Sequence, residues 1–170
     1  MILERDASGA REAGGEPVGD VTVDARLVLP FDMRSRSRFR AQLDNGEAVG
    51  VILTRGHILR GGDRLRAQDG RVIGVVAAAE TVSTAHVRDG AILARGAYHL
   101  GNRHVAVQIG PSWLRYSHDH ILDGMVRGLG FTPVVEEAPF EPEGGAYHSH
   151  DGHAVHDGHH AHGSGHKHEH

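Results

Sequence analysis

Hydrophobic and polar positions follow two different spacings along the chain, and the change near residue 76 predicts two parts of different structure. From Val21 to Val76 the apolar residues come in short runs, several alternating with polar residues, and turn sequences separate the runs. Asp44-Asn45-Gly46-Glu47 is typical of a hairpin turn between strands at 38–43 and 49–53. Two further strands are expected at 64–67 and 72–76. We therefore expect an all-β domain over residues 1–75, with the Gly-, Ala- and Glu-rich start of the chain outside its core.

The second part combines helices with strands. An extended run ends near Val87, and Asp89 can then cap a helix with one apolar face that stops at Gly101. Strands are expected at 105–109, where Val and Ile alternate with other residues, and at 113–116 after a Pro-Ser turn.

A second helix is expected to begin at a Ser117 cap, because apolar residues recur from Ile121 to Leu129 at i, i+1, i+4, i+5 and i+8. A last short strand at 132–136 completes the order β-α-β-β-α-β. That order is the ferredoxin-like pattern. We therefore expect an α+β protein in which a ferredoxin-like domain at 76–138 follows the β domain.

The end of the chain is predicted to be an acidic linker and a disordered metal-binding tail, residues 139–170. Ten of the 16 histidines lie in the last 23 residues, separated mainly by Gly, Ser and Asp, and this composition cannot form a core. Neutral imidazoles suit Ni²⁺, Zn²⁺ and Cu²⁺, and cysteine is absent. The alternative is that these histidines belong to a purification tag, but tags are usually unbroken histidine runs. The tail histidines are His148, His150, His153, His156, His159, His160, His162, His166, His168 and His170.

Charge and hydropathy exclude several classes of protein. The net charge is −4 with neutral histidine, and no apolar stretch is long enough to be a signal sequence or a membrane span. Arginines at positions 34, 36, 38 and 40 form a stripe at period two, which we interpret as a solvated or protein-docking face of a strand and not as a nucleic-acid site. Phosphate-loop, Gly-x-Ser-x-Gly and His-Glu-x-x-His motifs are absent, so we expect a cytoplasmic protein that is not an enzyme.

Six histidines precede the tail, and three of them, His57, His86 and His99, are expected to be structural. His104 comes where the first helix turns into a strand, so its side chain can project from the domain. The sequence pattern alone leaves it open whether His104 is a surface residue or a ligand. His118 and His120 could share a metal only if the backbone between them is extended, and the Ser117 cap favours an exposed first helical turn with at most a weak secondary site.

Several segments together resemble one known family, the nickel metallochaperone among the urease accessory proteins, often called accessory protein E. The resemblance covers the chain from about Leu27 to its end, and the Gly-Asn-Arg-His motif is specific. It is carried by residues 55–63 (Arg-Gly-His-Ile-Leu-Arg-Gly-Gly-Asp), 97–109 (with Gly101-Asn102-Arg103-His104), 114–123 (Leu-Arg-Tyr-Ser-His-Asp-His-Ile-Leu-Asp) and 144–148 (Gly-Gly-Ala-Tyr-His).

This resemblance implies an N-terminal domain of the peptide-binding type and a homodimer joined through the ferredoxin-like domain. It implies that His104 and its symmetry mate bind one nickel ion, that His148 or His150 adds ligands, and that His118 and His120 bind extra metal. The implied partners are the urease maturation GTPase, the other urease accessory proteins and, indirectly, the urease apoprotein. Two other functions remain open: a nickel or zinc buffer without a client, and a peptide-binding module in which metal is incidental.

Overall fold

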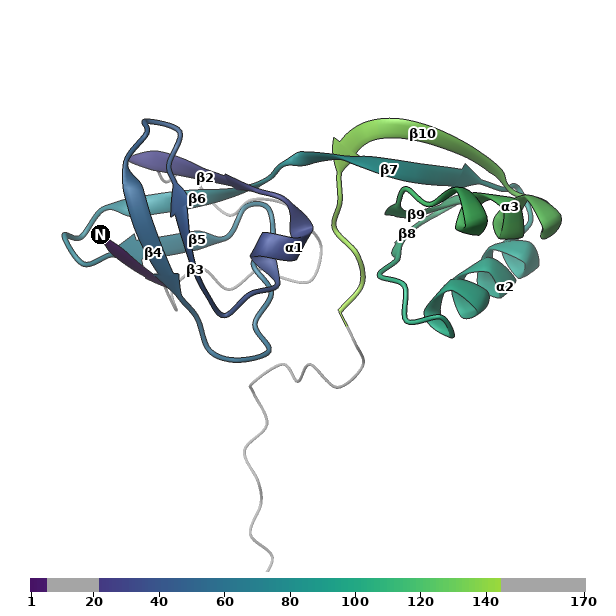
Figure 1. Ribbon diagram of the computed structural model, residues 1–170, viewed down its shortest axis with the longest axis horizontal. Coiled ribbons are helices and arrows are strands. Elements are labelled where there is room, and N and C mark those ends of the chain that lie inside the picture. Colours follow the sequence, from purple (N-terminus) through teal and green to yellow (C-terminus); the bar gives the residue numbers. More distant parts are fainter. Residues whose placement is uncertain (6–21, 145–170) are drawn as a thin grey trace, which may run out of the picture.

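The computed structural model describes residues 1–5 and 22–144, so the expected start segment and histidine tail lie outside the described residues. Two β-sheets and three helices form two parts that follow one another along the chain (Figure 1). The mixed α+β class expected from the sequence is confirmed, and the two sheets are consistent with two domains. Within the described ranges no helix has the length and apolarity that a membrane crossing needs.

The first part is a six-stranded sheet whose inward side chains alternate with outward ones. Its strands are β1 (Ile2–Arg5), β2 (Ala25–Leu29), β3 (Arg38–Gln42), β4 (Ala48–Ile52), β5 (Arg64–Ala67) and β6 (Val72–Ala77), in the spatial order β2-β6-β5-β1-β4-β3. Leu3, Leu27, Leu65 and Ile73 are fully buried in its core. Because side chains along a strand alternate between faces, the apolar residues at every second position form this core.

Two elements of the first part differ from the sequence prediction. β1 lies inside the sheet, parallel to β4 and antiparallel to β5, although only four residues form it. A helical turn, α1 (Phe31–Arg34), follows Pro30 between β2 and β3, so the expectation of an all-β domain was wrong in this detail. Segments this short carry too few residues for a periodic pattern to predict them.

The second part is a four-stranded antiparallel sheet with two helices on one face (Figure 1). Along the chain it runs β7 (Ala79–His86), α2 (Gly90–Gly101), β8 (Gln108–Gly110), β9 (Trp113–Ser117), α3 (His120–Gly128) and β10 (Thr132–Pro139), with the spatial order β10-β7-β9-β8. Leu100, Leu114, Val126 and Phe131 pack in the core between helices and sheet.

α2 begins and ends where the sequence indicated. The Asp89 carboxylate accepts hydrogen bonds from the backbone N–H groups of Ala91 and Ile92, at 2.7 and 3.2 Å, as an N-cap does. Gly96 is buried where α2 packs on the core, and a β carbon there would lie 2.4 Å from Phe131 Cζ. The helix therefore approaches the core more closely than a larger residue would permit.

The prediction of a Ser117 cap for α3 was wrong. Ser117 is the last residue of β9, where it pairs with Val82, and Asp119 is the N-cap instead. Its carboxylate accepts hydrogen bonds from Ile121 N and Leu122 N, and these two bonds hold the pKa of Asp119 below its usual value. Aspartate and serine cap helices about equally well, and the pairing of Ser117 with Val82 in the sheet leaves Asp119 as the cap.

Two strand lengths also differ from the prediction. β8 has three residues, since residues 105–107 form an irregular segment after α2. β10 has eight residues and pairs with β7 as far as Pro139, which lies opposite Ala79. The expected acidic linker therefore begins as part of the sheet.

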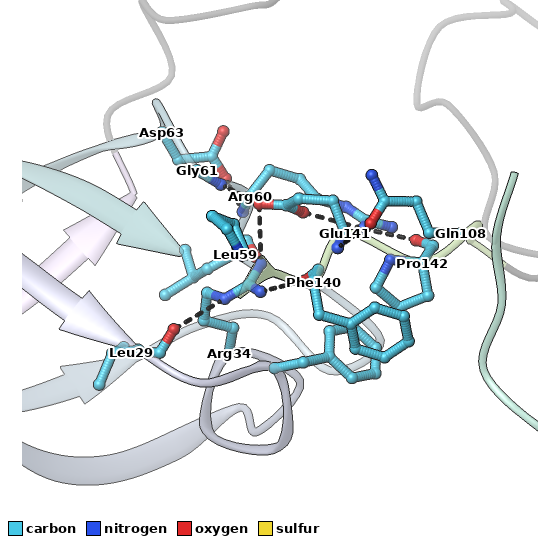
Figure 2. A network of polar contacts seen from close by, with 12 residues as sticks. Leu29, Arg34, Leu59, Arg60, Gly61, Asp63, Gln108, Phe140, Glu141 and Pro142 are labelled. Carbon is cyan, nitrogen blue, oxygen red and sulfur yellow. Dashed lines mark hydrogen bonds and ion pairs between the residues drawn. The ribbon is translucent and has the colours of Figure 1, made fainter. Parts of the chain in front are cut away.

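Residues 140–143, which we call the strap, were predicted to be an extended linker but pack between the two parts (Figure 2). The Phe140 ring is fully buried, 5.5 Å from the ring of Phe31 in an edge-to-face arrangement. Glu141 pairs with Arg34 of the first part at 3.0 Å, and its backbone N–H donates to Gln108 Oε1 of the second part. A fully buried aromatic ring and a paired carboxylate turn a nominal linker into a packed connection.

Arg34 connects the strap to the first part. Its guanidinium is fully buried, and it donates to the carbonyl oxygens of Leu29, Leu59 and Phe140. Three carbonyls and one carboxylate together satisfy this buried cation, as burial of a charge requires. Arg34 therefore belongs to the interior and not to an exposed stripe.

Candidate metal-binding site

His104 occupies an unusual backbone position immediately after α2. Its φ is 57°, and it is the one non-glycine residue with positive φ in the described ranges. The N–H of His104 donates to Gly101 O, and the N–H of Val105 donates to Leu100 O, at 2.9 and 3.2 Å. These two bonds form the Schellman arrangement, in which the left-handed residue that ends the helix is usually glycine.

Histidine at this position places an imidazole at the surface. The residue is exposed, and the turn directs the chain away from the helix toward β8. Because a β carbon is disfavoured in the left-handed region, a side chain kept there is more readily explained by what it contacts outside the fold than by the stability of the turn. The sequence prediction that His104 projects from the domain is confirmed.

His118 and His120 are arranged differently from the prediction. Asp119 between them has φ −150° and ψ 120°, which is extended backbone, and only His120 belongs to α3. Since side chains at i and i+2 of an extended segment leave the chain on the same side, the pair is not separated by a helical turn. The reason given for discounting a shared metal is therefore wrong.

The ring of His118 contacts the second sheet. Its Nδ1 lies 3.0 Å from Ser83 Oγ and 3.6 Å from Asp123 Oδ2. The Asp123 side chain is buried, and it also accepts a hydrogen bond of 2.8 Å from the Tyr116 hydroxyl. One edge of the His118 ring is thus fixed by the protein while the side chain as a whole remains 36% exposed.

The remaining described histidines are separate from these. His57 lies in a loop, His86 ends β7, and His99 in α2 contacts the ring of Tyr98 edge-to-face at 5.4 Å. In residues 1–5 and 22–144, no three His, Asp or Glu side chains are grouped so that they could hold a metal ion. The tail histidines that we expected to bind metal, from His148 to His170, lie outside the described residues.

The end of the strap, from which the tail continues, lies near His104. The N–H of Glu143 donates to Val107 O at 2.8 Å, and Val107 is the third residue after His104. The side chain of Arg60 also holds the strap, donating to Pro142 O at 2.6 Å. The chain therefore enters the tail from the same region of the surface as the α2–β8 turn.

The arginine stripe divides into three environments. Arg34 is interior, as described above, and Arg36 forms an exposed ion pair with Asp32 at 2.8 Å. Arg38 and Arg40 lie on the outward face of β3, because Phe39 and Ala41 between them face the core. The interpretation as one strand face holds only for the last two.

The residues that fix His118 were not identified from the sequence. Ser83, Tyr116 and Asp123 lie on three different elements, and strand pairing is what places Ser83 opposite Tyr116. One signal was available, since Asp123 lies on the buried face of α3, three residues before buried Val126. A carboxylate on an apolar helix face indicates a buried polar partner.

Comparison with known proteins defines the family. The profile described as "UreE urease accessory protein, N-terminal domain" matches residues 12–78, and the profile described as "UreE urease accessory protein, C-terminal domain" matches residues 80–170. The chain therefore belongs to the UreE family of urease accessory proteins, as the resemblance indicated.

Individual relatives agree over most of the chain. Urease accessory protein UreE of Alkalilimnicola ehrlichii is 62% identical over 124 residues, which cover 73% of this chain and 76% of the relative. The protein of the same name from Pseudomonas putida strain GB-1 is 54% identical over 132 residues, covering 77% and 80%. That from Teredinibacter turnerae is 47% identical over 138 residues, covering 81% and 90%.

Proposed function

We propose that this protein is a cytoplasmic nickel metallochaperone that binds Ni²⁺ as a homodimer and delivers it to the urease maturation complex through the maturation GTPase. The observation that carries the proposal is His104, an exposed imidazole in a left-handed position after α2. Membership of the urease accessory family supplies the client, because the relatives are named for their role with urease. Nickel is the cargo of the protein, and Zn²⁺ or Cu²⁺ would bind the same imidazoles.

A dimer supplies what one chain lacks. In the described residues no three His, Asp or Glu side chains are grouped around His104, so a single copy does not offer a full set of ligands there. A two-fold axis beside the turn would double that number, and neutral imidazoles without thiolates would release the ion again. Tyr98, in the last turns of α2, is 67% exposed, and aromatic side chains of this kind are enriched in protein interfaces.

The position of the strap allows tail histidines to complete the site. Five steps along the chain lead from Glu143 to His148, a reach of at most about 18 Å, whereas the three steps from Val107 to His104 span at most about 11 Å. His148 and His150 can therefore approach His104, and the later histidines of the tail would hold further ions weakly. Through the extended backbone at Asp119, His118 and His120 offer a secondary site.

We also propose a domain division on these grounds. The division is at residues 1–75 and 76–138, except that β6 of the first sheet continues to Ala77. The second unit is ferredoxin-like, supported by the order β-α-β-β-α-β and by the antiparallel strand order β10-β7-β9-β8. Residues 139–170 contain the last residue of β10, the strap and the metal-binding tail. Dimerisation belongs to the second unit, because His104 lies in it.

Calorimetric titration with nickel tests the site. In the chain lacking Ser149–His170, we expect about one tight ion per dimer, because a two-fold axis shares one ion between two copies of His104. The His104→Ala variant of that chain should bind none tightly. His86→Ala is the matched control, since His86 is also exposed but ends a strand, and it should bind as the parent does. Tight binding retained in the His104→Ala variant would contradict the assignment.

Client delivery requires a separate experiment, because a buffer would bind nickel equally well. The full chain should co-purify with the urease maturation GTPase, and nickel should strengthen that association. A protein that binds nickel but never retains the GTPase would be a metal buffer. A protein that binds peptides through its first unit equally well with and without metal would be a peptide-binding module.

A further inference from the structure

A row of buried hydrogen-bonding side chains leads from His118 into the second part of the protein. Ser83 and Tyr116 are fully buried on neighbouring strands β7 and β9, and Asp123 is buried on α3. His118 Nδ1 contacts Ser83 Oγ at 3.0 Å, Ser83 hydrogen-bonds to the Tyr116 hydroxyl, and that hydroxyl contacts Asp123 Oδ1 at 2.8 Å. His118, which lies between β9 and α3, is thus connected in one series with three side chains from three elements.

The carboxylate at the inner end fixes the direction of every bond in the series. Ionised Asp123 only accepts, so the Tyr116 hydroxyl donates its single proton to it. In the hydrogen bond between Tyr116 and Ser83, the Ser83 hydroxyl must therefore be the donor. This bond uses the single proton of Ser83. Ser83 Oγ is left as an acceptor, and the group that donates to it is the Nδ1–H of His118.

One cation lies beside the inner end of the series, since Arg127 Nη2 is 3.9 Å from Asp123 Oδ2. The Tyr116 hydroxyl is fully buried against the carboxylate, so its single proton is directed to Asp123 Oδ1.

We propose that Asp123, acting through Tyr116 and Ser83, is a positioning residue that holds His118 as the Nδ1–H tautomer and leaves the Nε2 lone pair available to a divalent metal ion beside His120. No described residue makes a hydrogen bond to Nε2 of His118 in the structure, and the side chain is partly exposed. A histidine that ligates metal through one nitrogen commonly donates its other N–H to a carboxylate or another acceptor, which fixes the ring and raises its basicity.

The assignment of the ion as nickel rests on the proposed function, whereas the tautomer does not. A free histidine side chain in water prefers the opposite tautomer, with the proton on Nε2. The buried series is therefore a specific cause for the Nδ1–H form, and the form can be measured without metal.

Long-range ¹H–¹⁵N spectra of the metal-free full chain near pH 8 test the tautomer. The His118 signals are identified as those missing from the His118→Ala variant. We expect them to show a protonated Nδ1 and an unprotonated Nε2. Tyr116→Phe removes the central hydroxyl, and Ser83→Ala removes the acceptor of the Nδ1–H, so both variants should shift His118 toward the Nε2–H form.

Thr84→Val is the matched control. Thr84 neighbours Ser83 on β7, but its hydroxyl donates to Glu136 and accepts from Arg115 instead of bonding to His118. Its His118 tautomer should match that of the parent. Circular dichroism and thermal melting of all variants show whether each is folded, and Tyr116→Phe and Ser83→Ala give two independent opportunities to obtain a folded protein.

Nickel titration of the same samples connects the tautomer to metal binding. Paramagnetic broadening of the His118 and His120 signals should require about tenfold more nickel in Tyr116→Phe than in the parent, while the tail signals broaden alike in both. An Nε2–H ring at His118 in the parent would overturn the inference. An Nδ1–H ring that nickel leaves unaffected would instead overturn the assignment of His118 and His120 as a metal site, so the two failures are distinguishable.

Discussion

Replacing His104 with glycine should stabilise the protein while removing the proposed central metal ligand. His104 has φ 57° at the end of α2, where a β carbon is disfavoured by about 1 kcal/mol. Glycine adopts this conformation without that penalty and keeps both backbone hydrogen bonds of the turn. We therefore expect His104→Gly to raise the free energy of unfolding of the metal-free protein by about 1 kcal/mol relative to His104→Ala, which keeps a β carbon.

The comparison of the two variants is made in the presence of a chelator, because bound nickel would stabilise the parent by mass action. Neither variant has an imidazole at position 104, so both should lose the tight nickel site. Thermal melting should place the glycine variant about 4 °C above the alanine variant. Equal melting temperatures, or a lower one for glycine, would refute the argument that His104 is kept at a cost to stability.

Three further predictions concern the interior and the tail. Arg34→Met should lower the free energy of unfolding by about 3 kcal/mol, because it removes the buried donor to three carbonyl oxygens and leaves Glu141 with Arg60 as its remaining cation. Arg36→Met should stay within about 0.5 kcal/mol, because its ion pair with Asp32 is exposed; urea unfolding of both variants measures the difference. Gly96→Ala should lower the free energy of unfolding by about 2 kcal/mol, because its β carbon would overlap the Phe131 ring. Gly101→Ala is the control and should not destabilise the protein, because nothing lies within 4 Å of its β carbon. Equal losses in the two variants would contradict the packing argument. On acidification from about pH 7 to 5 the full chain should lose metal steeply, because a protonated imidazole cannot bind a metal ion. The chain lacking Ser149–His170 should retain its ion to a lower pH. Identical curves of metal retention against pH for the two proteins would contradict the existence of two classes of site.

Periodic patterns predicted the regular elements well. Strands β5 and β6 and helix α2 were expected within about a residue of where they lie, because alternation and an Asp cap mark them locally. The same reasoning placed the start of α3 at Ser117, because both Ser117 and Asp119 can cap a helix and only strand pairing with β7 decides between them. That pairing joins residues distant in sequence, and no local pattern records it.

The candidate site shows the same division. His104 was identified as a projecting residue from the helix-to-strand turn, but its left-handed backbone conformation required the structure. The series from His118 to Asp123 could not be predicted, because it depends on which strands are neighbours. Likewise, Arg34 looked like one of four equivalent arginines, although a single helical turn directs it into the interior.

Because of the strap, the folded first part includes residues that follow the second sheet in the sequence. Phe140, which follows β10, packs in one cluster with Phe31, Val82 and Ala138, and it accepts a hydrogen bond from Arg34. A fragment cut at residue 75 would retain Arg34 and Phe31 but lose the ring and the carboxylate that cover them. The two sheets are therefore expected to unfold together as one cooperative unit, in spite of the clear boundary between them along the chain.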